Sequence, residues 1–287
     1  MEASIVAAPD ALRAHLHGMW AAVAAPWGEH AEYVDARAAA VTLAMLAACR
    51  PGPGERVLEL ACGPGGAGLA AADHVGPAGE VILSDVVAEM TAIAAARARA
   101  RGLTNVRTRV LDLESIDEPD RSYDVVLCRE GLMFAPDPGR AAREIQRVLR
   151  PGGRVAVAVW GPLERNPWLG LVFDAVSAQT GAPVPPPGVP GPFSLGGDGQ
   201  VAALLTGAGL SDVRLSEVPT PLRAGSFDEW WQRTSALAGP LAKVLAGQSA
   251  EARQALRSAL QEAVRPYSSH TGAVDIPGLT LVASARR

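Results

Sequence analysis

The spacing of apolar residues divides the chain into regions with different expected structures. Between residues 9 and 49 apolar side chains recur every three to four positions, which predicts two amphipathic helices. A break between them is expected near Pro26, Trp27 and Gly28, because proline and glycine interrupt helices. From residue 55 to 160, short and almost wholly apolar runs alternate with helical patterns. This alternation predicts strands and helices in turn.

Five strands are expected in this second region, at 56–61, 80–85, 106–112, 123–128 and 154–160. Helices are expected among them at 65–75, 88–101 and 138–150. Strands without polar alternation are typical of parallel sheets that are covered on both faces. The pattern therefore predicts a doubly wound α/β sheet, in which ligands bind beyond the carboxyl ends of the strands.

The pattern changes after Trp160. Residues 181–199 contain six prolines and six glycines, which excludes a helix or a central strand and leaves a surface lid or a linker. A helix is expected at 199–209, followed by a strand at 212–218. Further helices are expected within 226–266, and a last strand at 279–287.

Composition excludes several classes of function. The 287 residues carry a net charge of −4, whereas nucleic-acid binding normally needs a basic surplus. The three cysteines fit neither a zinc-site spacing nor a CxxC redox motif. We see no signal-peptide pattern, and no apolar run approaches the roughly 18 residues of a membrane span. We expect a cytoplasmic protein that binds neither membranes nor nucleic acid.

The run VLELACGPGG, residues 57–66, poses the main chemical question, because its glycines let backbone N–H groups approach a ligand. It lacks the Lys-Ser/Thr pair of a phosphate-binding P-loop. The spacing Gly63 to Gly68 matches a dinucleotide motif, and Asp85 lies where such a site has its ribose-binding acid. Glu59 argues against that ligand, since its carboxylate would repel a pyrophosphate. A nucleoside with a cationic amino-acid arm suits both acids.

These residues belong to a larger resemblance. VLELACGPGG resembles motif I of the class I S-adenosylmethionine-dependent methyltransferases, with Ala61 in place of the first glycine. ILSD, VLDLES, YDVVLCREGLMFAPDP and LRPGGRVAVAVW resemble the later motifs and follow in family order. The similarity is to the ubiquinone/menaquinone-type C-methyltransferases (methyltransferase type 11) and their actinobacterial natural-product relatives.

The resemblance implies a seven-stranded Rossmann-like sheet whose last strand is antiparallel. It also implies four segments: an N-terminal helical lid (1–50), a cofactor-binding core (51–165), a lid insertion with a helix and the sixth strand (166–225), and a helical cap with the final strand (226–287). The implied cofactor is S-adenosylmethionine, with S-adenosylhomocysteine as product and no metal. The implied cofactor contacts are Glu59, Gly63, Gly65, Asp85, Val86, Met90, Asp112, Leu113 and Arg129.

An acceptor pocket is expected outside the first four strands, where all six tryptophans lie. Aromatic side chains on separate lids suit a flat apolar molecule. His270 is expected in a loop near the site, as a proton acceptor together with Tyr33, and Glu130 ranks below them as a base. The candidate acceptor contacts are Trp20, Trp27, Tyr33, Met133, Trp160, Trp168 and His270.

The sequence thus predicts methyl transfer to a small aromatic acceptor, such as an indole or a phenol, in specialised metabolism. Carbon is weakly favoured as the methylated atom, with oxygen or nitrogen as the alternative. Two other classes stay open: an NAD(P)-dependent oxidoreductase, and a non-catalytic protein that binds adenosylmethionine. The expected assembly is a monomer or a homodimer.

Overall fold

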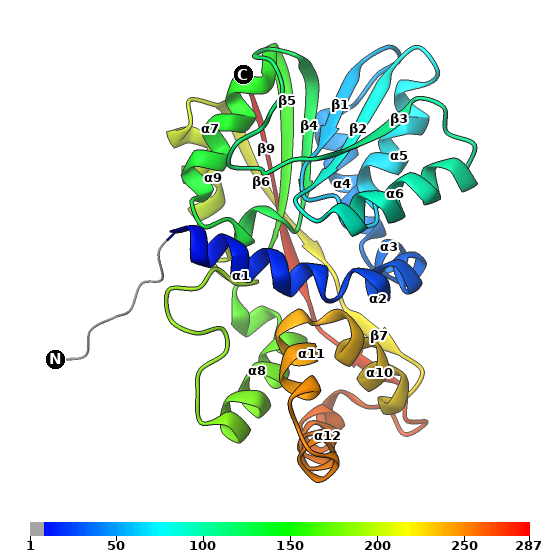
Figure 1. The fold of residues 1–287 in the computed structure, drawn as a ribbon, viewed down its shortest axis with the longest axis vertical. Helices are drawn as coiled ribbons and strands as arrows, with labels where there is room; N and C mark the ends of the chain where they lie inside the picture. Colours follow the sequence, from blue (N-terminus) through cyan, green and yellow to red (C-terminus); the bar gives the residue numbers. More distant parts are fainter. Residues whose placement is uncertain (1–8) are drawn as a thin grey trace, which may run out of the picture.

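The centre of the molecule is one seven-stranded sheet, seen in a computed structural model that describes residues 9–287 (Figure 1). Its strands are β1 (Arg56–Glu59), β2 (Glu80–Asp85), β3 (Val106–Val110), β4 (Tyr123–Arg129), β5 (Leu149–Trp160), β6 (Ser211–Pro219) and β9 (Leu279–Arg286). They lie in the order β3-β2-β1-β4-β5-β9-β6. Strands β1 to β5 pair in parallel, and β9 runs antiparallel to β5 and β6. The expected fold class and antiparallel last strand are confirmed.

The apolar strands supply two separate cores because successive side chains point to opposite faces of a sheet. On β1, Val57 belongs to one core and Leu58 to the other. On β2, Val81 and Leu83 belong with Val57, whereas Ile82 belongs with Leu58. All of these side chains are nearly inaccessible to solvent. The absence of polar alternation in these strands therefore reflects burial on both faces.

Helices cover both faces of the sheet (Figure 1). On one face lie α4 (Ala39–Cys49), α5 (Gly66–Val75) and α6 (Ala88–Ala100). On the other lie α7 (Pro138–Val148) and α9 (Gln200–Gly207). This layering leaves the carboxyl ends of the strands facing the rest of the chain.

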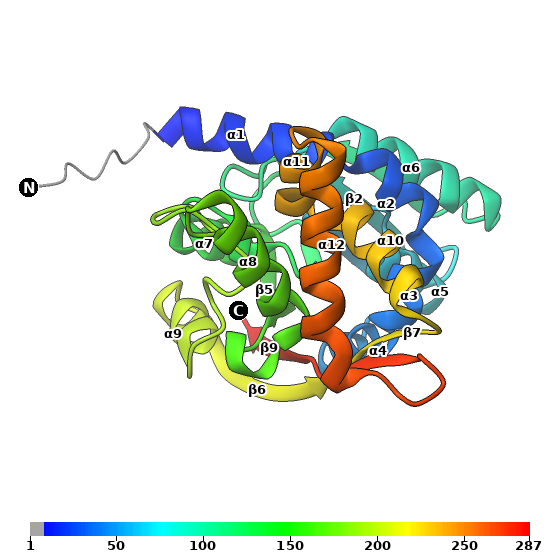
Figure 2. The same cartoon turned by 90° about the horizontal axis from the view of Figure 1, so that it is seen from below.

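A second, mainly helical part faces those carboxyl ends. It contains α8 (Pro167–Thr180), α10 (Phe227–Leu237), α11 (Gly239–Ala246), α12 (Ala250–Val264) and the small sheet of β7 (Leu222–Ala224) with β8 (Val274–Ile276). The N-terminal helices α1 (Pro9–Ala21), α2 (Ala24–Glu29) and α3 (Ala31–Arg37) cross between this part and the sheet (Figures 1 and 2). Short 3-10 turns are η1 (Leu132–Phe134), η2 (Leu163–Arg165) and η3 (Arg265–Tyr267). The four-segment division inferred from the resemblance remains a proposal.

The expected break near Pro26 was wrong in its position. Pro26, Trp27 and Gly28 lie inside α2, and the interruptions fall instead at residues 22–23, at His30 and at Ala38. Pro26 is tolerated because it occupies the first turn of its helix, where the backbone N–H groups have no intrahelical partner. Residues 181–199 contain neither helix nor strand, as expected.

Replacing Gly68 with alanine tests how closely α5 packs on the sheet. A Cβ there would lie 2.2 Å from Leu83 Cδ2 and 2.6 Å from Glu59 Oε2. We expect Gly68→Ala to lower the free energy of unfolding by about 1–3 kcal/mol, measured by urea denaturation. Gly18→Ala is the control, because Gly18 is exposed on α1 with nothing near its Cβ position. It should stabilise by up to about 1 kcal/mol, and equal effects would contradict the packing argument.

Candidate active site

The turn between β1 and α5, residues 60–65, is called the glycine turn below. Ala61, Gly63 and Gly65 have positive φ angles of 50°, 50° and 89°. The two glycines adopt this conformation without strain, and the N–H of Gly65 donates to the carbonyl of Cys62 at 2.8 Å. A Cβ on Gly65 would approach Leu83 Cδ1 to 3.0 Å, so Gly65 packs against the sheet and does not line a cavity. The turn leaves its outer edge open to a ligand.

Asp85, at the end of β2, holds the glycine turn in place. Its Oδ2 accepts the N–H of Gly63 at 2.9 Å, and its Oδ1 accepts the N–H of Val87 at 3.0 Å. Burial raises the pKa of this carboxyl, whereas the backbone donors oppose the rise. Each carboxylate oxygen keeps a further lone pair, so Asp85 has capacity for two more hydroxyl donors. That capacity suits the two hydroxyls of a ribose.

Glu59 lies elsewhere than the sequence suggested. Its side chain is only 1% exposed and its Oε2 accepts the N–H of Gly68 at 2.7 Å. It therefore does not line the cavity beside the glycine turn, where contact with a ligand was expected. The reason is the direction of the side chain, which points to the start of α5 on the face shared with Val57. Burial raises the pKa of Glu59 to about 7, partly opposed by the nearby Arg129.

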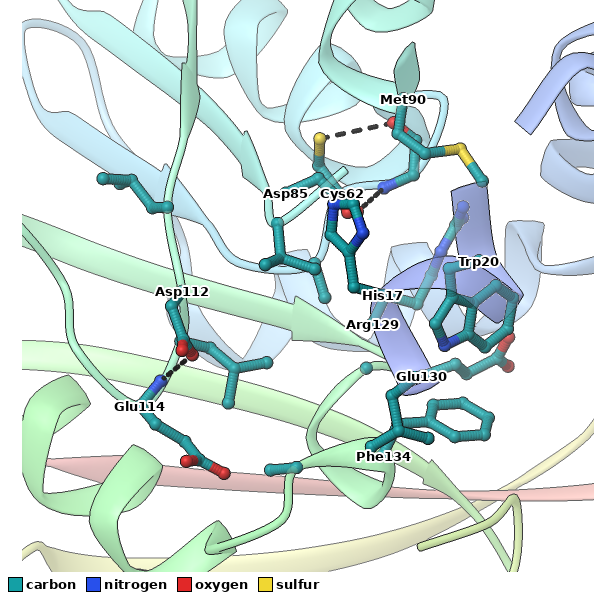
Figure 3. Close-up of a pocket in the computed structure, with 18 of the residues that line it drawn as sticks. His17, Trp20, Cys62, Asp85, Met90, Asp112, Glu114, Arg129, Glu130 and Phe134 are labelled. Carbon is teal, nitrogen blue, oxygen red and sulfur yellow. Dashed lines mark hydrogen bonds between the residues drawn. The ribbon is translucent and has the colours of Figure 1, made fainter. Parts of the chain in front are cut away.

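A first cavity of about 1120 Å³, part of it open to solvent, lies along the ends of β1 to β4. Most of the side chains and glycines expected to contact the cofactor line it. Figure 3 shows Asp85 and Asp112 on one side of this cavity, with Trp20 and Phe134 on the other. The expected residues that line it are Gly63, Asp85, Val86, Met90, Asp112, Leu113 and Arg129.

Helix α1 covers this first cavity. His17 and Trp20 face it from α1, and Arg13 forms an ion pair with Glu114 across the opening. Glu114 is only 2% exposed and also accepts the N–H of Asp137 at 2.5 Å. The ion pair joins α1 to the loop after β3, next to Asp112. Helix α1 is therefore positioned as a cover over any ligand in the first cavity.

The positive charges around the first cavity have partners. Arg13 is paired with Glu114, and Arg129 is paired with Asp35 at 3.2 Å and donates to Thr42 at 2.8 Å. The acids Asp85, Asp112 and Glu130 also face the cavity. This balance favours a cationic ligand over a doubly charged anion such as a pyrophosphate.

A second cavity of about 1010 Å³, again partly open, adjoins the first. Five residues line both: Trp20, Trp27, Val34, Glu130 and Phe134. The second cavity is mainly aromatic and aliphatic. The expected acceptor contacts that line it are Trp20, Trp27, Tyr33, Met133, Trp160 and Trp168.

The aromatic side chains of the second cavity come from widely separated segments. Trp20 packs edge-on against Trp27 and Phe134, with ring centroids 5.7 and 4.9 Å apart. The indole N–H of Trp27 donates to the carbonyl of Leu237 at 3.0 Å, which connects α2 to α10. Such contacts join the N-terminal helices, the end of the sheet and the cap around one apolar space.

Two charged residues that line the second cavity have buried polar atoms without a hydrogen bond to the described part of the chain. Arg37, at the end of α3, has Nε and Nη2 buried and without a hydrogen bond to the described part of the chain. Glu130, immediately after β4, has its Oε1 in the same condition and a positive φ of 59°. Burial lowers the pKa of Arg37 and raises that of Glu130. Both residues are partly exposed and line the second cavity.

The expected position of His270 was wrong. His270 is exposed in the turn before β8 and lines neither the first nor the second cavity. The loop was expected to lead directly into the last strand, but β8 intervenes and pairs with β7 in a separate small sheet. That pairing keeps the turn away from the strand ends, so a proton relay between His270 and Tyr33 is not supported. Tyr33 itself lines the second cavity beneath the guanidinium of Arg233, 4.1 Å from its ring centroid.

Sequence reasoning missed Arg37, Arg13 and Glu114, and it ranked Glu130, which lines both cavities, below His270 and Tyr33. Only one of them had a usable signal: Glu130 follows a strand at the edge of the sheet where ligands bind. Arg37 and Arg13 lie within helical patterns, where an arginine normally indicates a solvated face.

Comparison with known proteins agrees with this geometry. A family model described as a methyltransferase domain matches residues 51–168. The chain is 33% identical over 191 residues to nocamycin O-methyltransferase of Saccharothrix syringae, covering 62% of this chain and 67% of that protein. The chain belongs to the S-adenosylmethionine-dependent methyltransferases.

Two further proteins give shorter or more distant matches. The C-methyltransferase UbiE of Ectopseudomonas mendocina is 37% identical over 126 residues, which are 44% of this chain and about half (49%) of that protein. Phosphoethanolamine N-methyltransferase 2 of Haemonchus contortus, solved with S-adenosylmethionine, has a TM-score of 0.53 at 19% identity. That alignment covers 86% of this chain and 52% of the other, and it supports the fold.

The methyltransferase cofactor is S-adenosylmethionine, and the residues of the first cavity fit it. Asp85 offers acceptors for a diol, and Val86, Met90 and Leu113 offer apolar surface for a flat base. The acids that face this cavity without an ion pair in the described chain, Asp85, Asp112 and Glu130, suit the positive sulfonium and ammonium groups of the cofactor. Within residues 9–287 no group of acids, histidines and cysteines has the arrangement of a metal site. No helix in the described part of this methyltransferase is long and apolar enough to cross a membrane.

Glu59→Gln should change how stability depends on pH. Because burial raises the pKa of Glu59 from 4.5 to about 7, the folded protein binds a proton more tightly than the unfolded chain does. Wild-type stability should therefore fall as the pH rises through this range. We expect the variant to melt several degrees above wild type at pH 8, with a smaller advantage at pH 5. A difference in melting temperature that does not change with pH would contradict the buried, titrating carboxyl.

Proposed function

We propose that this protein transfers a methyl group from S-adenosylmethionine to a small, largely aromatic acceptor in specialised metabolism. The observation that carries the proposal is the wall that the two cavities share. The methyltransferase motifs line the first cavity, and five residues, among them Trp20 and Glu130, also line the second. Ligands in the two cavities would thus lie next to each other and contact the same five side chains. Indoles and phenols are the acceptor classes that the aromatic surface suits best.

The cofactor contacts in this proposal are those that line the first cavity. Asp85 would bind the ribose hydroxyls, Asp112 and Leu113 would contact the adenine, and the glycine turn would receive the methionine end. Arg129 would also contact the cofactor, with its guanidinium held in place by the ion pair with Asp35. When bound, the cofactor supplies an activated methyl group on a sulfonium, so the protein mainly has to position the acceptor.

Glu130 is the residue we propose to accept the proton of the acceptor. It lines both cavities, and its Oε1 has no hydrogen-bond partner among residues 9–287. Burial raises its pKa, although Arg129 and Arg37 oppose the rise. A carboxylate with a raised pKa is a stronger base near neutral pH. In this proposal Glu130 takes the role of proton acceptor that the sequence suggested for His270, which lines neither cavity.

The methylated atom is carbon in our first choice and oxygen or nitrogen in the alternative. Attack by an electron-rich ring carbon and attack by a hydroxyl both release a proton, so Glu130 would serve either reaction. The names of the relatives include both a C- and an O-methyltransferase. A cytoplasmic location and a monomeric or homodimeric state remain predictions.

Calorimetric titration tests the cofactor cavity. We expect S-adenosylmethionine and S-adenosylhomocysteine to bind with micromolar Kd, about −8 kcal/mol, and NAD⁺ and NADPH not to bind. Asp85→Ala should weaken binding at least about tenfold, because it removes acceptors for the ribose and for the N–H of Gly63. Asp73→Ala is the control, since Asp73 is 60% exposed and pairs with Arg101 outside the cavity. Binding of a nicotinamide dinucleotide instead would favour the oxidoreductase alternative.

Glu130→Gln tests the proposed base. With labelled S-adenosylmethionine and an acceptor found by screening indoles and phenols, we expect kcat to fall about 100-fold. The Kd of S-adenosylhomocysteine should stay within a factor of a few. In wild type, activity should rise with pH as Glu130 loses its proton, at a pKa above the ordinary range of a glutamate, and the variant should lack this rise. A variant with unchanged kcat and pH profile would exclude Glu130. Bound cofactor without turnover on any acceptor would favour a non-catalytic role.

A further inference from the structure

Arg37 is an unusual residue in the wall of the second cavity. Its guanidinium lies 4.1 Å from the ring centroid of Trp168 and 4.9 Å from that of Trp160. The two indoles themselves pack edge-on, 5.1 Å apart. Stacking on aromatic rings uses the face of a guanidinium and leaves the N–H groups along its edge free to donate. The two rings therefore hold the guanidinium of Arg37 in this wall.

The donors of Arg37 that lack partners form one edge of the guanidinium. Nε and Nη2 are the buried nitrogens without a hydrogen bond in the described chain, and their outward N–H bonds run parallel. Such an edge matches the two oxygens of a carboxylate, which accept both hydrogen bonds at once. In this structure those two nitrogens are covered by neighbouring atoms, but Arg37 lines the second cavity without an ion pair in the described chain, and a cation in such apolar surroundings favours an anionic ligand.

Other arginines near the cavities are satisfied within the protein. Arg129 pairs with Asp35, and Arg233, which also lines the second cavity, pairs with Glu229 at 2.5 Å. No such pair is formed by Arg37 with Glu130, although both face the second cavity. The two side chains form no ion pair with each other, and both residues line the second cavity. A ligand that contacts both would meet one charge of each sign.

We propose that the acceptor is an aromatic molecule that carries a carboxylate, which binds the guanidinium of Arg37. This inference rests on the proposed function and narrows its substrate class. The carboxylate is an anchor and is not the methylated group. The opposite end of the acceptor carries the acidic hydrogen that Glu130 takes. The aromatic body lies among the side chains that include Trp160 and Trp168.

Binding measurements with a matched pair of probes test this inference apart from turnover. With the protein saturated with S-adenosylhomocysteine, 6-hydroxy-2-naphthoate and 2-naphthol are titrated; they differ only in the carboxylate. We expect wild type to bind the naphthoate about tenfold more tightly, or better, as charge-assisted bidentate hydrogen bonds allow. Equal binding, preference for 2-naphthol, or no binding of either probe would overturn the inference. Methyl transfer from labelled cofactor to other acceptors would still support the proposed function.

Variants assign any preference to Arg37. Arg37→Met should remove the preference for the naphthoate, and Arg37→Lys should reduce it, because an ammonium lacks the two-pronged edge. Arg233→Met is the matched control: it also removes a stacked arginine from this cavity, but one already paired with Glu229. It should retain the preference. If Arg37→Met, or Arg37→Lys should the first fail to fold, keeps the full preference, Arg37 is not the anchor.

Stability gives a second readout that does not need a ligand. If Arg37 serves a ligand, the free protein carries an unsatisfied buried cation, and Arg37→Met should leave the melting temperature unchanged or raise it. If Arg37 serves only the fold, through its stacking on Trp160 and Trp168, the same substitution should lower the melting temperature. A clear decrease would therefore count against the inference.

Discussion

The site depends on two acids that bind backbone N–H groups of one turn and the helix that follows it. Asp85 accepts the N–H of Gly63, and Glu59 accepts that of Gly68 at the start of α5. Both carboxyls are buried, and burial raises the pKa of each. The cost of burying them is offset only while these hydrogen bonds exist. The turn, the helix and the strand ends therefore form one unit that shapes the first cavity.

A second set of contacts connects this unit to the N-terminal helices. Asp35 of α3 accepts hydrogen bonds from Arg97 of α6 at 2.6 Å and from Arg129 of β4 at 3.2 Å. Asp35 comes so close to the start of α5 that a Cβ on Gly66 would lie 1.9 Å from its Oδ1. This ion-pair cluster holds α3 above the strand ends. It thereby places Arg37, half a turn later on α3, against the second cavity.

The two cavities differ in chemistry although they share a wall. The first offers acids and backbone donors beside a larger apolar surface, with its arginines already paired. The second is enclosed by aromatic rings and is lined by Arg37, which forms no ion pair in the described chain. Glu130 faces both, at the point where a group transferred between two ligands would pass. Segregating the charges in this way lets one site take a cationic cofactor and the other an aromatic anion.

The sheet, the family and seven of the nine expected cofactor contacts could be predicted from the sequence alone. Apolar runs and helical periods are local patterns, and the glycine turn, Asp85 and Asp112 follow strands within a few residues. Three features could be seen only in the folded chain: the direction of Glu59, the exclusion of His270 by the β7–β8 pairing, and the position of Arg37 and Glu130 on one cavity. These depend on packing between distant segments. Whether a polar side chain finds a partner in the folded chain is not encoded in its neighbours along the sequence.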